Sequence, residues 1–121
     1  MFHGYLFTED VTFDLREIGL PCFDGYHGLR QFFSDVFDNM SHHAHYAHYG
    51  TNVAVRHLDA DTASVWAYVI GMKVRDGVQV TLHVKYFLDY VRTPAGWTIS
   101  RFSEVPILPM SDSLTQVHRS H

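Results

Sequence analysis

The stretch VQVTLHVKYFLDYVRT, residues 78–93, is rich in β-branched and aromatic residues and runs into the compact turn TPAG (93–96). Three segments of similar composition accompany it: GTNVAVRHL (50–58), ASVWAYVIGMKV (63–74) and GWTISRFSEV (96–105). The short sequences DAD (59–61) and RDG (75–77) separate the first three segments. Consecutive strand patterns joined by tight turns are typical of β-hairpins. We therefore expect four long strands in an antiparallel meander.

The sequence before these segments has a different periodicity. In HGLRQFFSDVFDNM (27–40) the apolar residues recur at helical spacing, which predicts an amphipathic helix from about Gly28 to Met40. VTFDL (11–15) predicts a shorter strand, and the tail from Pro106 onward is polar. A strand, a helix and four strands predict an α+β domain in which a curved sheet packs on a helix, with a pocket between the two layers. We expect one domain over residues 1–121, with its core at about residues 6–105.

Composition narrows the classes of partner. The chain has 121 residues, 46% of them hydrophobic and 18% charged, with a formal net charge of −4 and no basic run, which argues against a nucleic-acid partner. The single cysteine, Cys22, cannot form an internal disulfide, and the first residues lack the features of a secretory signal. The longest apolar segment, SVWAYVIGM, is too short to span a bilayer. We therefore expect a cytoplasmic protein without a membrane partner.

Several segments, in this order, resemble one known family. They are LFTEDVTFDL (6–15), GLRQFF (28–33), HYGTN (48–52), DTASVWAYV (61–69) and FLDYVRTPAGWTISR (87–101). From about Leu6 to Arg101 the chain resembles the SnoaL-like branch of the nuclear-transport-factor-2-like superfamily. The resemblance implies a cone-shaped, cystatin-like α+β barrel around an apolar pocket. Relatives of the scytalone dehydratase, bile-acid dehydratase and hexachlorocyclohexane dehydrochlorinase type are cofactor-free lyases, and their proton-abstracting histidine corresponds to His48.

The resemblance also implies a carboxylate partner for this histidine. A carboxylate on the second ring nitrogen holds an imidazole in one tautomer and stabilises the imidazolium. In the relatives the aspartate comes from a helix that precedes the segment matched at Leu6, and this sequence begins only five residues earlier. Either the natural protein starts upstream, or another carboxylate takes this role, or His48 has no carboxylate partner. Asp14 on the short strand is our candidate for the second case, with Asp38 on the helix as the alternative.

The other histidines near His48 raise the question of a metal site. Residues 43–48, HAHYAH, have the form H-x-H-x-x-H, which resembles the metal-binding motif of metallo-β-lactamase-like hydrolases, but Ala47 stands at the position of the aspartate. On an extended strand His43 and His45 point to one face and His48 to the other, so one metal ion could not bind all three. We expect no metal and no cofactor.

Further residues are expected to line the substrate pocket. Trp66 and Tyr68 alternate to the same face of one strand, His83 lies on the next strand, and Arg101 could polarise a carbonyl group or bind an anion. The full predicted set is Phe33, Phe37, Asn52, Trp66, Tyr68, His83, Tyr86 and Arg101.

Two functions are compatible with these residues. The first is a cofactor-independent lyase or isomerase that dehydrates, eliminates or moves a proton on a small apolar molecule, with His48 as the general base. The alternative is a non-catalytic module of the same fold that binds a small molecule or a partner. Because a sheet without its first helix leaves apolar surface uncovered, we expect a homo-oligomer, either a dimer or a trimer.

Overall fold

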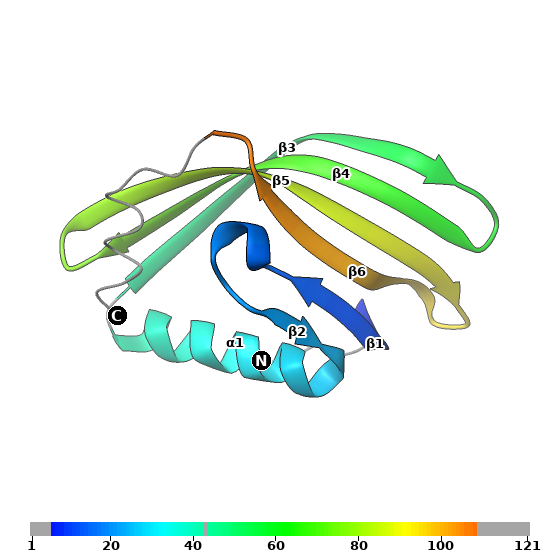
Figure 1. Ribbon diagram of the computed structural model, residues 1–121, viewed down its shortest axis with the longest axis horizontal. Coiled ribbons are helices and arrows are strands. Elements are labelled where there is room, and N and C mark those ends of the chain that lie inside the picture. Colours follow the sequence, from blue (N-terminus) through cyan, green and yellow to red (C-terminus); the bar gives the residue numbers. More distant parts are fainter. Residues whose placement is uncertain (1–5, 43, 109–121) are drawn as a thin grey trace.

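In the described part of the chain, six strands form one curved sheet in the order β2-β1-β6-β5-β4-β3, and the sheet arches over one long helix (Figure 1). This computed structural model describes residues 6–42 and 44–108. The elements are β1 (Phe7–Asp14), the 3₁₀ turn η2 (Arg16–Ile18), β2 (Cys22–Asp24), α1 (Gly25–His42), β3 (Ala44–Leu58), β4 (Thr62–Arg75), β5 (Val78–Thr93) and β6 (Gly96–Pro106). The predicted α+β class, with a curved sheet packed on a helix, is confirmed.

The predicted meander corresponds to strands β3 to β6, each antiparallel to the next. The β4–β5 hairpin closes through Asp76 and Gly77, and both residues have a positive φ. A type I′ turn, which is common in two-residue hairpins, requires this backbone conformation. In β3 the register shifts between Thr51 and Ala54, and Asn52 adopts a φ of 54° at this irregularity.

The sheet differs from the expected antiparallel one at its N-terminal edge. β1 pairs in parallel with β6, and the short β2 adds an antiparallel edge strand, with Phe13 opposite Phe23. The sheet is therefore mixed. The parallel pairing joins segments about 90 residues apart in the sequence, Asp14 with Ser103 for example, a relation that local patterns do not predict.

The helix is longer than predicted, spanning Gly25–His42 rather than Gly28 to Met40. Its buried residue Leu29 joins the core of the fold, and Phe32 and Phe33 pack against that core. Phe37, one turn further on, is 43% exposed. The side chains of residues 39–44, including Met40, His42 and His43, lie outside what the structure describes.

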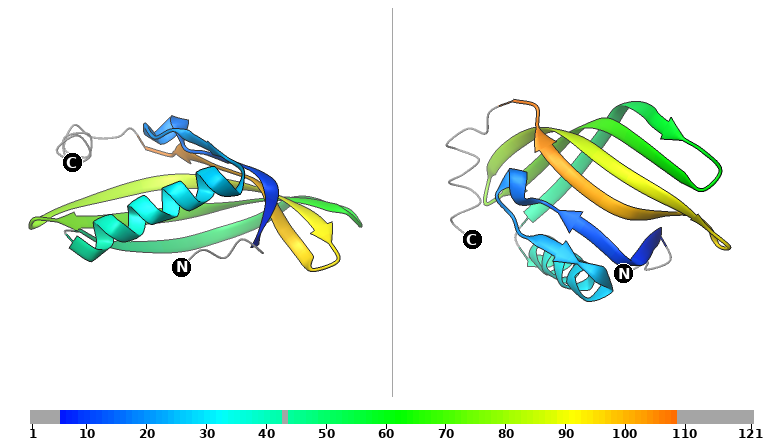
Figure 2. Two further views of the ribbon diagram at one scale, coloured as in Figure 1. Left: turned by 90° about the horizontal axis from the view of Figure 1, so that it is seen from below. Right: turned by 45° about the vertical axis from the view of Figure 1, so that its right-hand side comes forward.

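The two faces of the sheet have different surroundings. The face that packs against α1, here called the helix face, carries the buried Val69, Val84 and Phe102. Neighbouring residues on each strand point to the opposite side, here called the outer face, where Trp66 and Phe87 are cross-strand neighbours. Figure 2 shows α1 crossing one side of the sheet towards the start of β3. Within residues 6–42 and 44–108, no helix has the length and apolarity needed to cross a membrane.

Candidate functional site

His48 projects from the edge strand β3 onto the helix face. In the sheet register it lies opposite Gly71 of β4, which in turn lies opposite Leu82 of β5. Because Gly71 is two residues from the buried Val69, both residues point to the same side of the sheet. A methyl group at Gly71 would lie 3.6 Å from Cδ2 and 3.8 Å from Nε2 of His48, so the ring occupies the space above this glycine.

The imidazole of His48 is exposed and makes no hydrogen bond or ion pair with the described part of the chain. Both ring nitrogens can therefore reach a ligand or water. His45, three residues earlier on the same strand, lies opposite Val74 and points to the outer face. The predicted separation of His45 from His48 is confirmed.

A buried lysine lies beside this histidine. Lys73, two residues after Gly71 on β4, is 7% exposed and lies opposite Tyr46 of β3. Its ammonium group lies 5.5 Å from the centroid of the Tyr46 ring. Burial lowers the pKa of Lys73, and the positive charge of nearby Arg75 lowers it further. Burial also raises the pKa of the Tyr46 phenol.

The structure does not bring Asp14 to His48. The carboxylate of Asp14 accepts hydrogen bonds from the backbone N–H of Arg16 at 3.1 Å and from its guanidinium at 2.9 Å, and one from Arg101 Nη2 at 3.3 Å. These hydrogen bonds hold the pKa of Asp14 far below its ordinary value. Asp14 lies next to Phe13 of the core, and alternation turns its side chain to the outer face. Asp14 therefore belongs to a structural ion-pair cluster, and within the described chain no carboxylate contacts the His48 ring.

The residues predicted to line one pocket are divided between the two faces of the sheet. Phe33 and Tyr86 belong to the helix face, where both pack against the core. The outer face carries Trp66, Tyr68, His83 and Arg101, as alternation from the buried Ala67, Val69, Val84 and Phe102 requires. Asn52 is exposed at the irregularity of β3, and Phe37 is exposed on α1. The expectation that all eight line one pocket is corrected, because half of the set points away from His48.

The outer-face aromatic residues interact with a lysine of their own. The ammonium group of Lys85 lies 4.1 Å from the centroid of the Trp66 ring, 5.8 Å from that of Tyr68 and 5.2 Å from that of Phe87. Cation–π contacts of this kind stabilise a half-buried lysine at a sheet surface. The cluster thus explains these aromatic residues without a substrate.

A further titratable residue of the helix face, Glu104, was also not identified by sequence analysis. Glu104 of β6 lies opposite Tyr86 of β5, and burial raises its pKa to about 7. Burial and the nearby Glu104 raise the pKa of Tyr86 as well. No hydrogen bond or ion pair reaches Glu104 from the described residues. The position of Glu104 two residues after the core residue Phe102 is the only signal in the sequence that this carboxyl group points inward.

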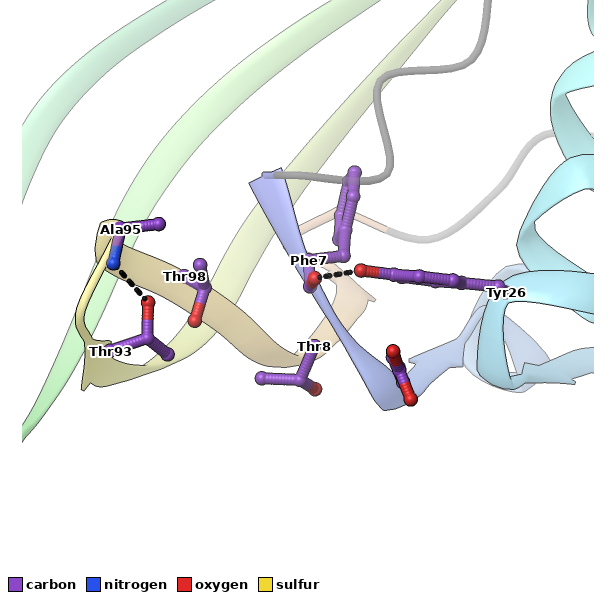
Figure 3. Close-up of a pocket in the computed structure, with 7 residues that line it drawn as sticks. Phe7, Thr8, Tyr26, Thr93, Ala95 and Thr98 are labelled. Carbon is purple, nitrogen blue, oxygen red and sulfur yellow. Dashed lines mark hydrogen bonds between the residues drawn. The ribbon is translucent and has the colours of Figure 1, made fainter.

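A separate hollow of about 320 Å³ lies at the other end of β5, far from His48 (Figure 3). Its lining residues are Phe7, Thr8, Glu9, Tyr26, Thr93, Ala95 and Thr98, none of which was predicted. Most of its polar groups are used within the fold: Tyr26 donates to the carbonyl oxygen of Phe7 at 2.8 Å, and the Thr93 hydroxyl accepts from the N–H of Ala95 at 3.2 Å. This hollow contains no histidine or lysine, so we place the candidate site at His48.

One histidine–aspartate pair does occur, at the β3–β4 turn. His57 Nε2 lies 2.9 Å from Asp59 Oδ2, with both side chains more than half exposed. The same carboxylate accepts hydrogen bonds from the N–H groups of Asp61 and Thr62, so it closes the turn rather than serving a pocket. Among the described residues no group of three histidine, cysteine or acidic side chains could hold a metal ion.

Comparison with known proteins gives a family match. Residues 4–103 match the family model described as a SnoaL-like domain. No curated protein matches the sequence significantly.

Solved structures show the same fold. A protein of Novosphingobium aromaticivorans, named provisionally as an aromatic ring hydroxylase, is 44% identical, with a TM-score of 0.79 over 91% of this chain and 78% of that one. The hexachlorocyclohexane dehydrochlorinase LinA-type3 of Novosphingobium barchaimii is 18% identical, with a TM-score of 0.71 over 85% of this chain and 69% of that one. A ketosteroid isomerase-like protein of Erwinia carotovora is 20% identical, with a TM-score of 0.66 over 87% of this chain and 78% of that one.

Proposed function

Because this chain belongs to the SnoaL-like domain family, we propose that it is a cofactor-independent lyase or isomerase acting on a small apolar molecule, with His48 as the general base. The observation that carries the proposal is the position of the imidazole. It lies on the helix face above a glycine, and its ring nitrogens are not used by any described residue. The aromatic residues of the same face pack into the core, so this side of the sheet is apolar, as a site for an apolar ligand requires.

The chemistry needs only a proton acceptor held next to a C–H bond. Imidazole is the side chain best suited to take and return a proton near neutral pH. In an elimination, His48 takes the proton, the C–H electron pair forms a carbon–carbon double bond, and the leaving group departs with its own bonding electrons. In an isomerisation the imidazolium returns the same proton to a different carbon. Dehydrochlorination and isomerisation, which appear in the names of two structural neighbours, can both begin with this step.

A second candidate function is the non-catalytic binding module. One observation favours it: no carboxylate of the described chain orients the His48 ring. Without an orienting group, an imidazole samples more than one position and tautomer, which lowers its efficiency as a base.

The ring-opening of 5-nitrobenzisoxazole separates the two functions. A base removes the single C–H proton of the heterocycle, the N–O bond breaks, and a coloured phenolate forms, so the reaction reports any base that an apolar ligand can reach. We expect the wild-type protein to accelerate this reaction and His48→Ala to lose roughly 10²- to 10⁴-fold in kcat/KM.

His45→Ala is the matched control, because His45 lies on the same strand and points to the outer face. This variant should retain the wild-type rate. Equal losses in both variants, or no loss in His48→Ala, would contradict the assignment of the base. A wild-type protein that binds the compound without turning it over would support the binding module instead.

A further inference from the structure

Lys73 is the most unusual charged residue of the helix face. It is one of only two lysines in the chain and is 7% exposed, whereas Lys85 lies on the outer face among aromatic rings. Burying an ammonium group is costly unless an anion or a set of hydrogen-bond acceptors replaces its water. A buried lysine therefore needs a partner or a function.

The described chain contains no anionic partner for Lys73. The titratable or charged groups near it are Tyr46 and His48 from β3 and Arg75 from β4, while its neighbour on β5 is Val80. None of these groups carries a negative charge near neutral pH, and the contact with the Tyr46 ring compensates only part of the lost hydration. Burial without an anionic partner also lowers the pKa of Lys73, because it disfavours the charged form of the amine.

The position of Lys73 relative to His48 is defined by the sheet. His48 lies opposite Gly71, and Lys73 lies two residues further along the same face of β4. Diagonal neighbours of this kind stand roughly 7–8 Å apart, a separation that both side chains can bridge through one small ligand. Gly71 places no side chain between them, and the His48 ring lies in van der Waals range of the position that a Cβ there would take.

We propose that His48 and Lys73 form the two ends of one ligand site, and that the Lys73 ammonium binds a carbonyl oxygen of the substrate next to the carbon that His48 deprotonates. This inference rests on the proposed function and names its substrate class, a small apolar carbonyl compound. As His48 takes the α-proton, the C–H electron pair forms the new C=C bond and the carbonyl π electrons move onto oxygen. The resulting enolate oxygen is stabilised by the ammonium group. Stabilisation of a developing negative charge by a preorganised donor is typically a large part of enzymatic rate enhancement.

The probe for this subsite is 4-nitrophenol, a planar compound whose phenolate oxygen resembles an enolate and whose ionised form is yellow. We expect the wild-type protein to bind the phenolate in preference to the neutral phenol at pH 6, which the absorbance of the bound probe measures directly. Lys73→Met keeps the length and apolar character of the side chain and removes its charge. This variant should bind the phenolate at least tenfold more weakly, and Lys73→Arg should retain most of the binding.

Lys85→Met is the matched control, since it removes the other lysine of the chain from the opposite face. Phenolate binding that is unchanged in Lys73→Met, or weakened equally in both methionine variants, would overturn the proposal. Circular dichroism and thermal unfolding of each variant establish that it is folded.

The two proposals can fail separately. If His48→Ala keeps the wild-type rate of 5-nitrobenzisoxazole ring-opening while Lys73→Met loses phenolate binding, His48 is not the base and Lys73 still forms an anion subsite. If His48→Ala loses the activity and Lys73→Met binds phenolate normally, the base stands and the carbonyl subsite is wrong.

Discussion

The imidazole of His48 lies directly above Gly71, close enough that a methyl group on the glycine would stand 3.6 Å from Cδ2 of the ring. A distance of 3.6 Å is ordinary van der Waals contact, so a small side chain could fit here and a large one would fill the space beside the ring. Gly71 does not need its freedom to adopt positive φ, because its backbone has the normal conformation of a strand. Its lack of a side chain therefore lets the His48 ring lie close to the strand and is not needed for a turn.

Two substitutions at Gly71 follow from this contact. Gly71→Ala should fold and be neutral or more stable by about 0.4–1 kcal/mol, because alanine restricts the unfolded chain and meets no close atom. Gly71→Leu should also fold, but the atoms beyond its Cβ would compete with the His48 ring for the same position and displace the ring. We expect a reduction of at least tenfold in kcat/KM for the ring-opening of 5-nitrobenzisoxazole. Wild-type activity in Gly71→Leu would show that the reaction does not depend on the position of the His48 ring above this residue.

Replacement of Asp14 should affect stability and leave catalysis unchanged. Hydrogen bonds from Arg16, and the charge of Arg101, lower the pKa of this carboxyl group in the folded protein. A pKa that is lower in the folded protein stabilises the fold at pH values above about 3.8, the pKa of this carboxyl group in the unfolded chain. This stabilisation is progressively lost as the pH falls below about 3.8. Asp14→Asn should therefore lower the Tm by several degrees at pH 7 and by less at pH 3.

The activity of Asp14→Asn is the second measurement. The carboxylate lies with two arginines on the side of the sheet away from His48, so the rate of ring-opening should match that of the wild-type protein below the Tm. A loss comparable to that of His48→Ala would mean that Asp14 does orient the imidazole.

Glu104 should make stability depend on pH in the opposite sense. Burial raises the pKa of Glu104 from 4.5 to about 7, so the folded state holds a proton that the unfolded state releases. The stability of the wild-type protein should consequently fall as the pH rises from about 4.5 to about 7. Glu104→Gln cannot ionise and should be more stable than the wild-type protein at pH 8 by roughly 2–3 kcal/mol, with little difference at pH 4.

Urea unfolding at these two pH values tests the prediction, and Glu17→Gln in the exposed turn η2 is the control. Equal stabilities of wild-type protein and Glu104→Gln at pH 8 would show that a partner compensates the carboxylate.

The strands were predictable because their signals are local. Alternating β-branched and aromatic residues between compact turns specify hairpins, and Asp76–Gly77 is a two-residue turn that fixes the β4–β5 register. The parallel pairing of β1 with β6 and the three-residue strand β2 depend on contacts between distant segments, which leave no periodic trace in a single sequence.

The faces on which the candidate residues lie were predictable in part for the same reason. The resemblance of the segment HYGTN to the SnoaL-like relatives singled out His48, and alternation separated His48 from His45. Alternation also shows that Trp66 and Tyr68 share a face, but only the buried positions of Ala67 and Val69 reveal that this face is the outer one. Large aromatic side chains suggested pocket residues, whereas the helix face of β4 carries the smaller residues Ala63, Ala67 and Val69.

The burial of Lys73 could not be predicted from its residue type or from its neighbours in the sequence. A lysine on a strand normally points to solvent. Because its neighbours on both faces of β4 are mostly apolar, the sequence does not show that Lys73 lies on the helix face with Val69.

The expectation of a homo-oligomer stays a prediction, as do the cytoplasmic location and the small-molecule partner.

The central claim is that the His48 imidazole is the proton acceptor, and chemical rescue tests it most directly. The measurement is the rate of 5-nitrobenzisoxazole ring-opening by His48→Ala with and without added imidazole. The truncated side chain leaves a gap beside Gly71, and free imidazole bound there should restore the rate along a saturating curve, while His45→Ala should show no such dependence. A folded His48→Ala protein that is as active as the wild-type protein, or that gains no rate from imidazole beyond the reaction in buffer, would contradict the account.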